Sequence, residues 1–354
     1  MDSGEEYAAV VHDFQSYVKV YSDGRVEREM DYVIDYETGF LKLDFQPASV
    51  DDDVWLPSKD VKISSETDVS VRLFKPKTIA PGEKIPIVIY FHGGFFVSQS
   101  AFGALYHYFL DSLVTEANVI AVSVEYRRAP EQFLPVAYDD SWEAVKWVAS
   151  HCAQKGPEEW LNEYGDFERV YFAGNEAGGN IAHNMAMRAG SDSLDGLKLS
   201  GLVLLNPFFG APEEPISEEA SEQRSDMDAL MSRGQKMWND ELWQFVNPET
   251  SGLDDPLYNP GADPNLSSLG CSRVLVWVAE LGNSKVWGYN YKDVLSKSGW
   301  DGKVEIRETK DTGSMFFLVD TVPRGDDTMV MLRKVTSFVN QKWEDPEEED
   351  EEEA

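Results

Sequence analysis

Apolar residues gather in short runs that are rich in β-branched and aromatic side chains. The five densest runs occupy residues 85–91, 119–124, 170–174, 202–205 and 274–278. Ahead of these runs, residues 51–77 alternate between apolar and polar positions as strands do. A helical pattern covers residues 178–188, between the third and the fourth run. Short apolar strands separated by helical intervals are typical of a parallel sheet covered on both faces. The pattern therefore predicts an α/β fold with a mostly parallel central sheet flanked by helices.

Two segments outside this pattern predict a helical cap or lid. Residues 5–20 place apolar side chains along one stripe of an amphipathic helix, which either forms a lid or packs on the core. Residues 211–247 begin acidic and continue with helically spaced Met, Leu and Trp side chains, which suit a cap with an apolar underside. We therefore expect one domain over residues 1–343, with the cap built from about 1–30 and 211–247.

Charge limits the partners that this chain is expected to bind. Its 354 residues include 64 acidic and 31 basic side chains, for a formal net charge of −33. Nucleic acids and anionic membranes carry phosphate and would be repelled, so neither is expected as a partner. Residues 344–354 are a block of like charge, which predicts a disordered acidic tail.

Cysteine content and the N-terminus suggest the compartment. Cys152 and Cys271 are the only cysteines, which is too few for a disulfide framework. The N-terminus is acidic and lacks the basic and apolar regions of a signal peptide, and no apolar stretch is long enough to span a membrane. We expect a cytoplasmic protein, with nuclear entry left open. Neither metal-ligand spacing nor a phosphate-binding loop is present, so no metal or cofactor is expected.

Three motifs carry a family resemblance. They are Phe-His-Gly-Gly at 91–94, Tyr-Arg-Arg-Ala-Pro-Glu at 126–131, and Gly-Asn-Glu-Ala-Gly-Gly-Asn-Ile-Ala-His-Asn at 174–184. In this order they resemble the plant carboxylesterase family, which includes hydrolases, gibberellin receptors, a hydroxyisoflavanone dehydratase and alkaloid cyclases. The resemblance extends from about residue 18 to residue 340. It implies an α/β-hydrolase fold with a nucleophile elbow at the third motif.

The same resemblance implies that the catalytic triad is lost. Serine hydrolysis requires a hydroxyl, an imidazole that takes its proton and a carboxylate that orients the imidazole. At the matching positions this chain has Glu176 for the serine, Gly282 for the aspartate and Ser314 for the histidine. No histidine follows His183, although the histidine comes last in the triad of this fold. His92 belongs with His183 to structural motifs of the family, and both are expected to hydrogen-bond to backbone. We expect a protein that is not a serine hydrolase.

The oxyanion hole and pocket walls are also assigned by the resemblance. The amides of Gly93, Gly94, Phe95 and Ala177 correspond to the hole, and Phe95 replaces the third glycine of the family motif. The sequence leaves open whether the Phe95 side chain fills the hole. The expected pocket residues are Gly282, Phe96, Trp238, Trp243 and Phe317.

Glu176 is the central candidate for chemistry. A carboxyl group in an apolar pocket has a raised pKa, which suits a general acid or base. In that role Glu176 moves a proton while Ser314 and Tyr289 bind polar groups of the substrate. Alternatively, Glu176 only hydrogen-bonds Asn175, Lys285 or nearby backbone.

Three functions remain open at this point. The first is a non-hydrolytic enzyme, such as a cyclase, dehydratase or other lyase or isomerase, acting on a small hydrophobic plant metabolite. The second is a small-molecule receptor resembling the gibberellin receptors. The third is an inactive relative that binds a protein partner. The contents of the pocket discriminate between them, and the protein is expected to be a monomer or homodimer.

Overall fold

The computed structural model describes most of the chain, with gaps at the termini and in a few internal segments. The described residues are 8–29, 32–34, 41–43, 45–51, 56–153, 155–210, 237–282, 284–319 and 325–340. The predicted acidic tail, residues 1–7 and residues 211–236 of the predicted cap therefore lie outside the described residues.

Each of the five dense apolar runs coincides with a strand of one central sheet, with Val119 one residue ahead of its strand. In the described residues this sheet has eight strands in the order β13-β12-β11-β10-β8-β9-β7-β6. Strands β6 and β7 pair antiparallel, β7 is antiparallel to β9, and the other pairs are parallel. The strands are β6 (Ser58–Lys62), β7 (Ser70–Phe74), β8 (Ile85–Phe91), β9 (Ile120–Glu125), β10 (Gly165–Asn175), β11 (Leu199–Leu205), β12 (Arg273–Ala279) and β13 (Lys303–Thr309). Strand β13 was not predicted, because this edge strand alternates charged and apolar residues instead of forming a dense apolar run.

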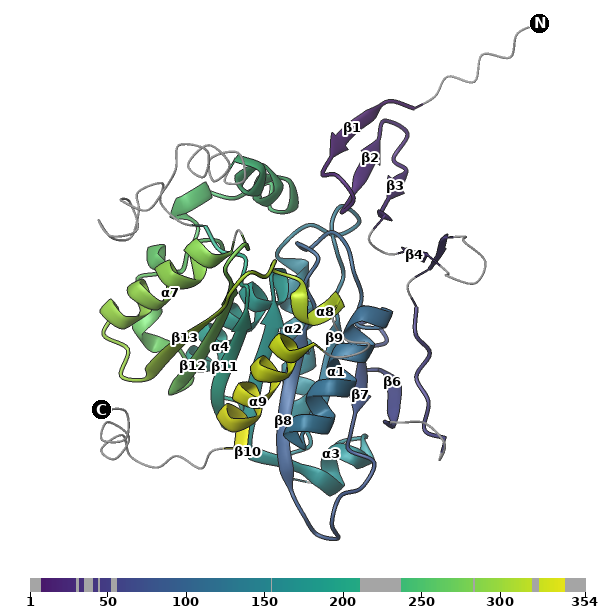
Figure 1. The fold of residues 1–354 in the computed structure, drawn as a ribbon, viewed down its shortest axis with the longest axis vertical. Coiled ribbons are helices and arrows are strands. Elements are labelled where there is room, and N and C mark those ends of the chain that lie inside the picture. The colour runs from purple at the N-terminus through teal and green to yellow at the C-terminus, as the bar shows by residue number, and fades with distance from the viewer. Residues whose placement is uncertain are drawn as a thin grey trace, which may run out of the picture.

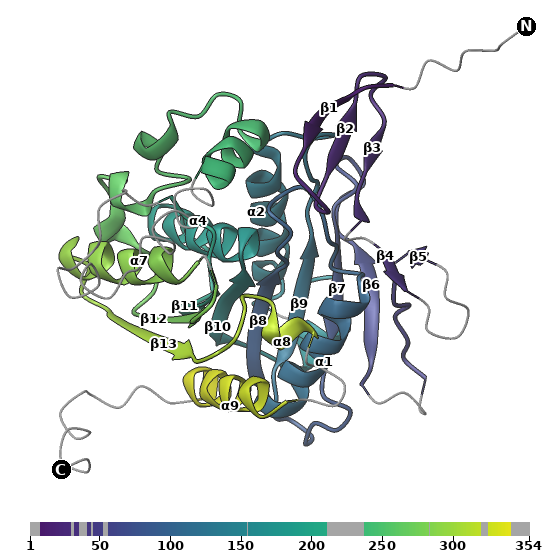
Figure 2. The same cartoon turned by 45° about the horizontal axis from the view of Figure 1, so that its top comes forward.

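Helices cover both faces of the sheet, as Figures 1 and 2 show. One face carries α2 (Val136–Ala149), α4 (Ala177–Ser191) and α7 (Lys285–Lys297), and the other carries α1 (Ala104–Ala117), α8 (Phe316–Val319) and α9 (Asp326–Asn340). The short helix α3 (Glu159–Tyr164) precedes β10. Along β8, the side chains of Ile87 and Ile89 pack in the core between the sheet and α2, α4 and α7. Those of Val88 and Tyr90 pack in the core between the sheet and α1, α8 and α9. Burial on both faces explains why these strands are apolar at nearly every position.

The predicted N-terminal helix is wrong wherever the structure describes it. Residues 8–29 instead form an antiparallel sheet of β1 (Val10–Asp13), β2 (Lys19–Tyr21) and β3 (Val26–Glu27). The Asp13 carboxylate accepts a hydrogen bond from Gln15 N at 2.9 Å, and Phe14 N donates to Val18 O at 2.9 Å. These bonds form a tight turn in which Phe14 and Val18 are both buried. Apolar residues four positions apart thus share a turn here, not a helix face.

The N-terminal sheet packs against a helix over residues 237–246. The ring of Phe14 lies 5.0 Å from that of Phe245 and 6.2 Å from that of Trp238. Arg28, after β3, donates to Ala129 O at 3.0 Å and to the Glu131 carboxylate at 3.0 Å. Figure 2 shows β1–β3 standing apart from the central sheet, followed by the antiparallel pair of β4 (Tyr32–Ile34) and β5 (Leu41–Leu43). The described parts of the predicted cap therefore contact each other, but the N-terminal part is a sheet.

Candidate active site

A cavity of about 600 Å³ opens at the carboxyl ends of the parallel strands. The loops that follow β8, β10, β11, β12 and β13 each contribute a residue to it, which is where α/β sheets place their ligands. The N-terminal sheet and the helix over 237–246 supply further walls. The lining residues are Gln15, Tyr17, Phe95, Glu176, Asn206, Trp238, Ser284, Trp287, Gly313, Ser314, Met315, Phe316 and Val319.

Glu176 occupies a sharp turn between β10 and α4. Its backbone has φ 48° and ψ −116°, a strained conformation that projects the side chain from the end of the strand. The turn is that tight because Gly178 lies directly against the carbonyl oxygen of Phe91 in β8. A glycine is required there, since a Cβ atom would overlap that oxygen. The predicted elbow is thus present in the fold, and it presents a carboxyl group.

Replacing this glycine is expected to disrupt the elbow. We expect Gly178→Ala to lower the free energy of unfolding by about 3 kcal/mol or more, because a rigid backbone carbonyl would have to move. Urea unfolding followed by tryptophan fluorescence measures the change. Gly313→Ala is the matched control, since a Cβ at Gly313 meets no described atom within 4 Å. Equal stability of the two variants would contradict the close approach at Gly178.

The Glu176 carboxyl group is almost completely buried, with 7% of the residue exposed. Its Oε2 accepts a hydrogen bond from Gly94 N at 3.1 Å. Burial raises the pKa of Glu176 to about 7, against the smaller opposing effect of the Gly94 bond. Lys285 instead pairs with Glu308 at 3.0 Å, and Asn175 accepts from Tyr90. Of the three hydrogen-bond partners expected for Glu176, which were Asn175, Lys285 and nearby backbone, the structure shows backbone, at Gly94 N.

The glycine turn after β8 is already hydrogen-bonded from within the protein. Gly93 N donates to the Tyr106 hydroxyl at 2.8 Å, and Gly94 N donates to Glu176. Phe95 retains a left-handed backbone with φ 54°, which costs a non-glycine residue about 1 kcal/mol. Its ring packs edge-on against Tyr17 and lines the cavity without closing it. One N–H of the expected oxyanion hole is therefore occupied by the Glu176 carboxyl.

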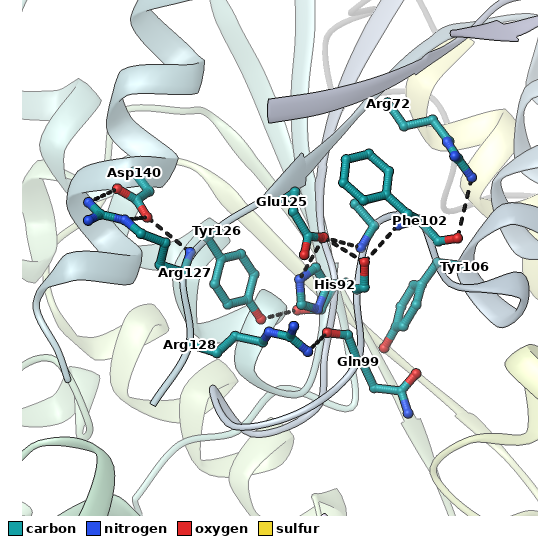
Figure 3. Close-up of polar contacts among 12 residues, drawn as sticks. Arg72, His92, Gln99, Phe102, Tyr106, Glu125, Tyr126, Arg127, Arg128 and Asp140 are labelled. Atoms are coloured by element: carbon teal, nitrogen blue, oxygen red, sulfur yellow. Dashed lines mark hydrogen bonds and ion pairs between the residues drawn. The ribbon is translucent and has the colours of Figure 1, made fainter. Parts of the chain in front are cut away.

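A polar network that includes His92 and Tyr126 lies next to this turn (Figure 3). His92 stacks on Tyr126 with ring centroids 4.2 Å apart, and the Tyr126 hydroxyl donates to His92 O at 2.8 Å. Burial lowers the pKa of His92 to about 3, so the ring is neutral and its Nδ1 lies 2.8 Å from Gly93 O. The backbone contact expected for His92 is confirmed. His183 differs, since its Nδ1 lies 3.1 Å from the Tyr291 hydroxyl.

Three loops bring a second set of polar side chains together at the cavity. Asn206 Oδ1 accepts from Ala279 N at 2.8 Å and from Ser284 Oγ at 3.0 Å, while its Nδ2 donates to Ser314 O at 2.9 Å. The Ser284 and Ser314 hydroxyl oxygens are 3.4 Å apart. A Cβ at Gly282 would lie against the Ser314 hydroxyl, so positions 282 and 314 adjoin. Sequence reasoning found Ser314 but missed Asn206 and Ser284, although Asn206 directly follows an apolar strand.

Comparison with known proteins identifies the family. Residues 88–318 match the family of the α/β-hydrolase fold. The chain is 39% identical over 338 residues to probable carboxylesterase 4, mitochondrial, of Arabidopsis thaliana, covering 93% of this chain and 83% of that protein. The chain belongs to the plant carboxylesterase-like family of α/β-hydrolases.

A relative with another activity and a solved structure extend the comparison. The chain is 36% identical over 333 residues to 2-hydroxyisoflavanone dehydratase of Glycyrrhiza echinata, covering 91% of this chain and 94% of that protein. The solved structure of esterase Est22 superposes with a TM-score of 0.64 at 22% identity, covering 81% of each chain. The α/β-hydrolase fold and the family expected from the motifs are confirmed.

Several residues predicted for the carboxylesterase-like pocket lie elsewhere. Tyr289 is 36% exposed and donates to Glu308 at 3.1 Å, because it lies two residues beyond Trp287 on α7 and so on the opposite side of that helix. Phe317 is buried in the core between the sheet and α1, where its ring lies 5.1 Å from that of Phe109. Its neighbour Phe316 lines the cavity instead.

Phe96 and Trp243 are also core residues. Their ring centroids are 6.0 Å apart, both are fully buried, and Trp243 stacks on Tyr258 at 4.8 Å. Phe95 and Trp238 do line the cavity, together with Tyr17, which sequence reasoning had assigned to a helix stripe. Ala177 is buried at the start of α4.

Other kinds of site were sought in the described part of the chain. None of the five histidines, all of which are described, lines the cavity. No three His, Cys, Asp or Glu side chains among the described residues come together in a way that would hold a metal ion. No described helix has the length and apolarity needed to cross a membrane.

Proposed function

We propose that this protein is a non-hydrolytic enzyme of the carboxylesterase-like family, a lyase, cyclase or isomerase in which Glu176 transfers a proton. The observation that carries the proposal is the position of the Glu176 carboxyl group. It lies buried at the nucleophile elbow, lines the cavity and accepts a hydrogen bond from Gly94.

Proton transfer suits this carboxyl group. A general acid or base works best when its pKa is close to the working pH, and burial raises the pKa of Glu176 to about 7. At neutral pH both the protonated and the ionised forms are populated. Ser284 and Ser314 line the same cavity, and their hydroxyl groups are the proposed partners of a polar group of the substrate.

Acyl transfer is less well supported by the same groups. A hydrolase needs free N–H donors at the position where the oxyanion forms, and Glu176 itself accepts from Gly94 N. A carboxylate nucleophile would form an ester that a histidine-activated water must cleave, and no histidine lines the cavity in the described residues. Relatives named as carboxylesterases and as a dehydratase are both compatible with this proposal.

The proposed substrate is a small hydrophobic plant metabolite. A cavity of about 600 Å³ falls within the range typical of small-molecule sites, which are mostly apolar with a few oriented polar groups. Tyr17, Phe95, Trp238, Trp287 and Phe316 supply aromatic walls. Such a pocket orients a reactive substrate and limits the access of water.

The hydrogen bond between Gly94 N and Glu176 also favours a second candidate, a small-molecule receptor. A carboxyl group that the backbone holds in place is a fixed binding group, and binding needs no proton transfer. An inactive relative that binds a protein partner would be expected to have its pocket filled by its own side chains, such as Phe95 and Phe317. This function is less favoured, because Phe95 leaves the cavity open and Phe317 is buried in the core on the α1 side of the sheet.

Incubation with a plant metabolite extract, followed by mass spectrometry, tests the proposal. We expect the wild-type protein to convert at least one compound to a new mass or isomer, and Glu176→Gln to slow that conversion by about 10² or more. The matched control is Glu168→Gln, the same exchange at an exposed position near the other end of β10.

Each outcome assigns one function. Conversion that survives in Glu176→Gln would contradict the role of this residue. A compound retained unchanged would support the receptor, and neither retention nor conversion would support the inactive relative.

A further inference from the structure

The cavity has an unbalanced set of charges. Among its lining residues in the described part of the chain, Glu176 is the only acidic side chain, and none is Lys, Arg or His. Lys285, on the adjacent helix α7, is paired with Glu308 at 3.0 Å. A ligand in this cavity therefore meets one carboxyl group and no cationic side chain among the described lining residues.

The walls next to Glu176 are aromatic. The rings of Tyr17, Phe95 and Trp238 form a mutual cluster with centroids 5.0, 5.4 and 5.8 Å apart. Trp287 and Phe316 line the same cavity. The faces of aromatic rings attract cations, and tryptophan attracts them most strongly.

We propose that the ligand of this cavity is a basic organic amine, bound as the ammonium ion with its nitrogen against Glu176 and its hydrocarbon part among the aromatic rings. The proposal rests on the proposed function only in taking the same cavity as the ligand site. It adds the chemical class of the ligand.

Electrostatics favours this class over the alternatives. An isolated carboxylate in a buried site is costly, and an ammonium ion restores the compensation that water no longer provides. A carboxylate or phosphate ligand would add a second negative charge beside Glu176, with no cationic side chain among the described lining residues. The net charge of −33 also raises the local concentration of cations around the protein.

The groups that face Glu176 from neighbouring elements do not change charge near neutral pH. They are Tyr17 in the N-terminal sheet, Tyr90 in β8, Tyr106 in α1 and Tyr126 after β9. Burial raises the pKa of each phenol above its usual value of 10, so all four stay neutral at pH 6–8. Glu176 is then the group whose ionisation controls cation binding in this range.

A pair of ligands with the same shape and different charge tests the proposal. Phenyltrimethylammonium carries a permanent charge, and tert-butylbenzene is its neutral isostere. Binding is measured by quenching of tryptophan fluorescence, since Trp238 and Trp287 line the cavity. We expect the cation to bind at least about tenfold more tightly than the isostere at pH 8. Its affinity is expected to rise about tenfold between pH 6 and pH 8, as Glu176 ionises.

Variants separate the charge from the shape of the site. Glu176→Gln is expected to remove the pH dependence and to reduce the preference for the cation to what the aromatic rings supply, while the affinity for tert-butylbenzene changes less than about twofold. Glu168→Gln is expected to behave as the wild type. Equal affinity for the two ligands, competition by benzoate, no effect of Glu176→Gln, or no binding of either ligand would each overturn the proposal.

The experiment also separates this inference from the proposed function. Cation binding without conversion of any metabolite would support the ligand class and contradict the enzyme. Glu176-dependent conversion of a neutral metabolite, with no preference for the cation, would support the enzyme and overturn the ligand class.

Discussion

The triple variant Glu176→Ser, Gly282→Asp, Ser314→His is expected to hydrolyse p-nitrophenyl acetate at least about a hundredfold faster than the wild-type protein. A complete triad raises the rate of a serine hydrolase by a factor of about 10⁶, and the expected gain is only a small part of that factor. The wild-type protein is expected to show no hydrolysis above the uncatalysed rate.

The geometry gives three reasons for this gain. The backbone turn that presents position 176 is already in the strained elbow conformation. Positions 282 and 314 adjoin, as an aspartate and the histidine that it orients must do. Removing the Glu176 carboxyl also frees Gly94 N, which then becomes available to an oxyanion.

A second triple variant is the matched control for this experiment. It carries alanine in place of serine at position 176, with Gly282→Asp and Ser314→His unchanged, and it is expected to remain inert. Initial rates of nitrophenol release at pH 8 measure both variants. Hydrolysis by the wild-type protein that disappears in Glu176→Ala would refute the proposed loss of esterase activity.

The stability of the wild-type protein is expected to fall, relative to Glu176→Gln, as the pH rises from 5 to 8. The pKa of Glu176 is about 7 in the folded protein and 4.5 as its ordinary value. Between these values the folded state binds more protons than the unfolded state, so raising the pH favours unfolding. The ionised carboxylate is then held in a buried site at a cost, and this cost is fully present above pH 7.

The expected size of this effect is about 2 to 3 kcal/mol. It is measured as the change, between pH 5 and pH 8, in the difference between the unfolding free energies of wild type and Glu176→Gln in urea. Other titrating groups affect both proteins and cancel in the difference. Glu168→Gln, the same exchange at an exposed position, provides the control. A constant difference for Glu176→Gln would show that the carboxyl is not protonated by burial.

The sequence by itself determined most strands of the central sheet, with β13 as the exception, and the turn at Glu176. Strands β8, β9, β11 and β12, and residues 170–174 of β10, are buried on both faces, so nearly every residue in them is apolar, and such runs are visible without any knowledge of their neighbours. The elbow is visible in the sequence as well, because its tight turn requires glycines at fixed spacing around Glu176, although the contact that excludes a side chain at Gly178 comes from Phe91 in β8. The identity of the residue at position 176, and hence the presence of a carboxyl group at the strand end, also follows directly from the sequence.

Only the tertiary structure decided which side chains meet in the cavity. Asn206, Ser284 and Ser314 are distant along the chain and come together because parallel strands end at one edge of the sheet. Helix phase separates Trp287 from Tyr289, and a single step along the chain separates Phe316 in the cavity from Phe317 in the core. A hydrophobic pattern shows that a residue is buried but not which neighbours bury it.

The N-terminal segment shows most clearly that a hydrophobic pattern does not identify the neighbours of a buried residue. Its apolar spacing fits a helix, yet the Asp13 side chain closes a turn, and contacts with Phe245 and Trp238 bury Phe14. The pKa of Glu176 depends likewise on burial by residues from several loops. Both outcomes depend on contacts between segments far apart in the sequence, and only the folded chain brings those segments together.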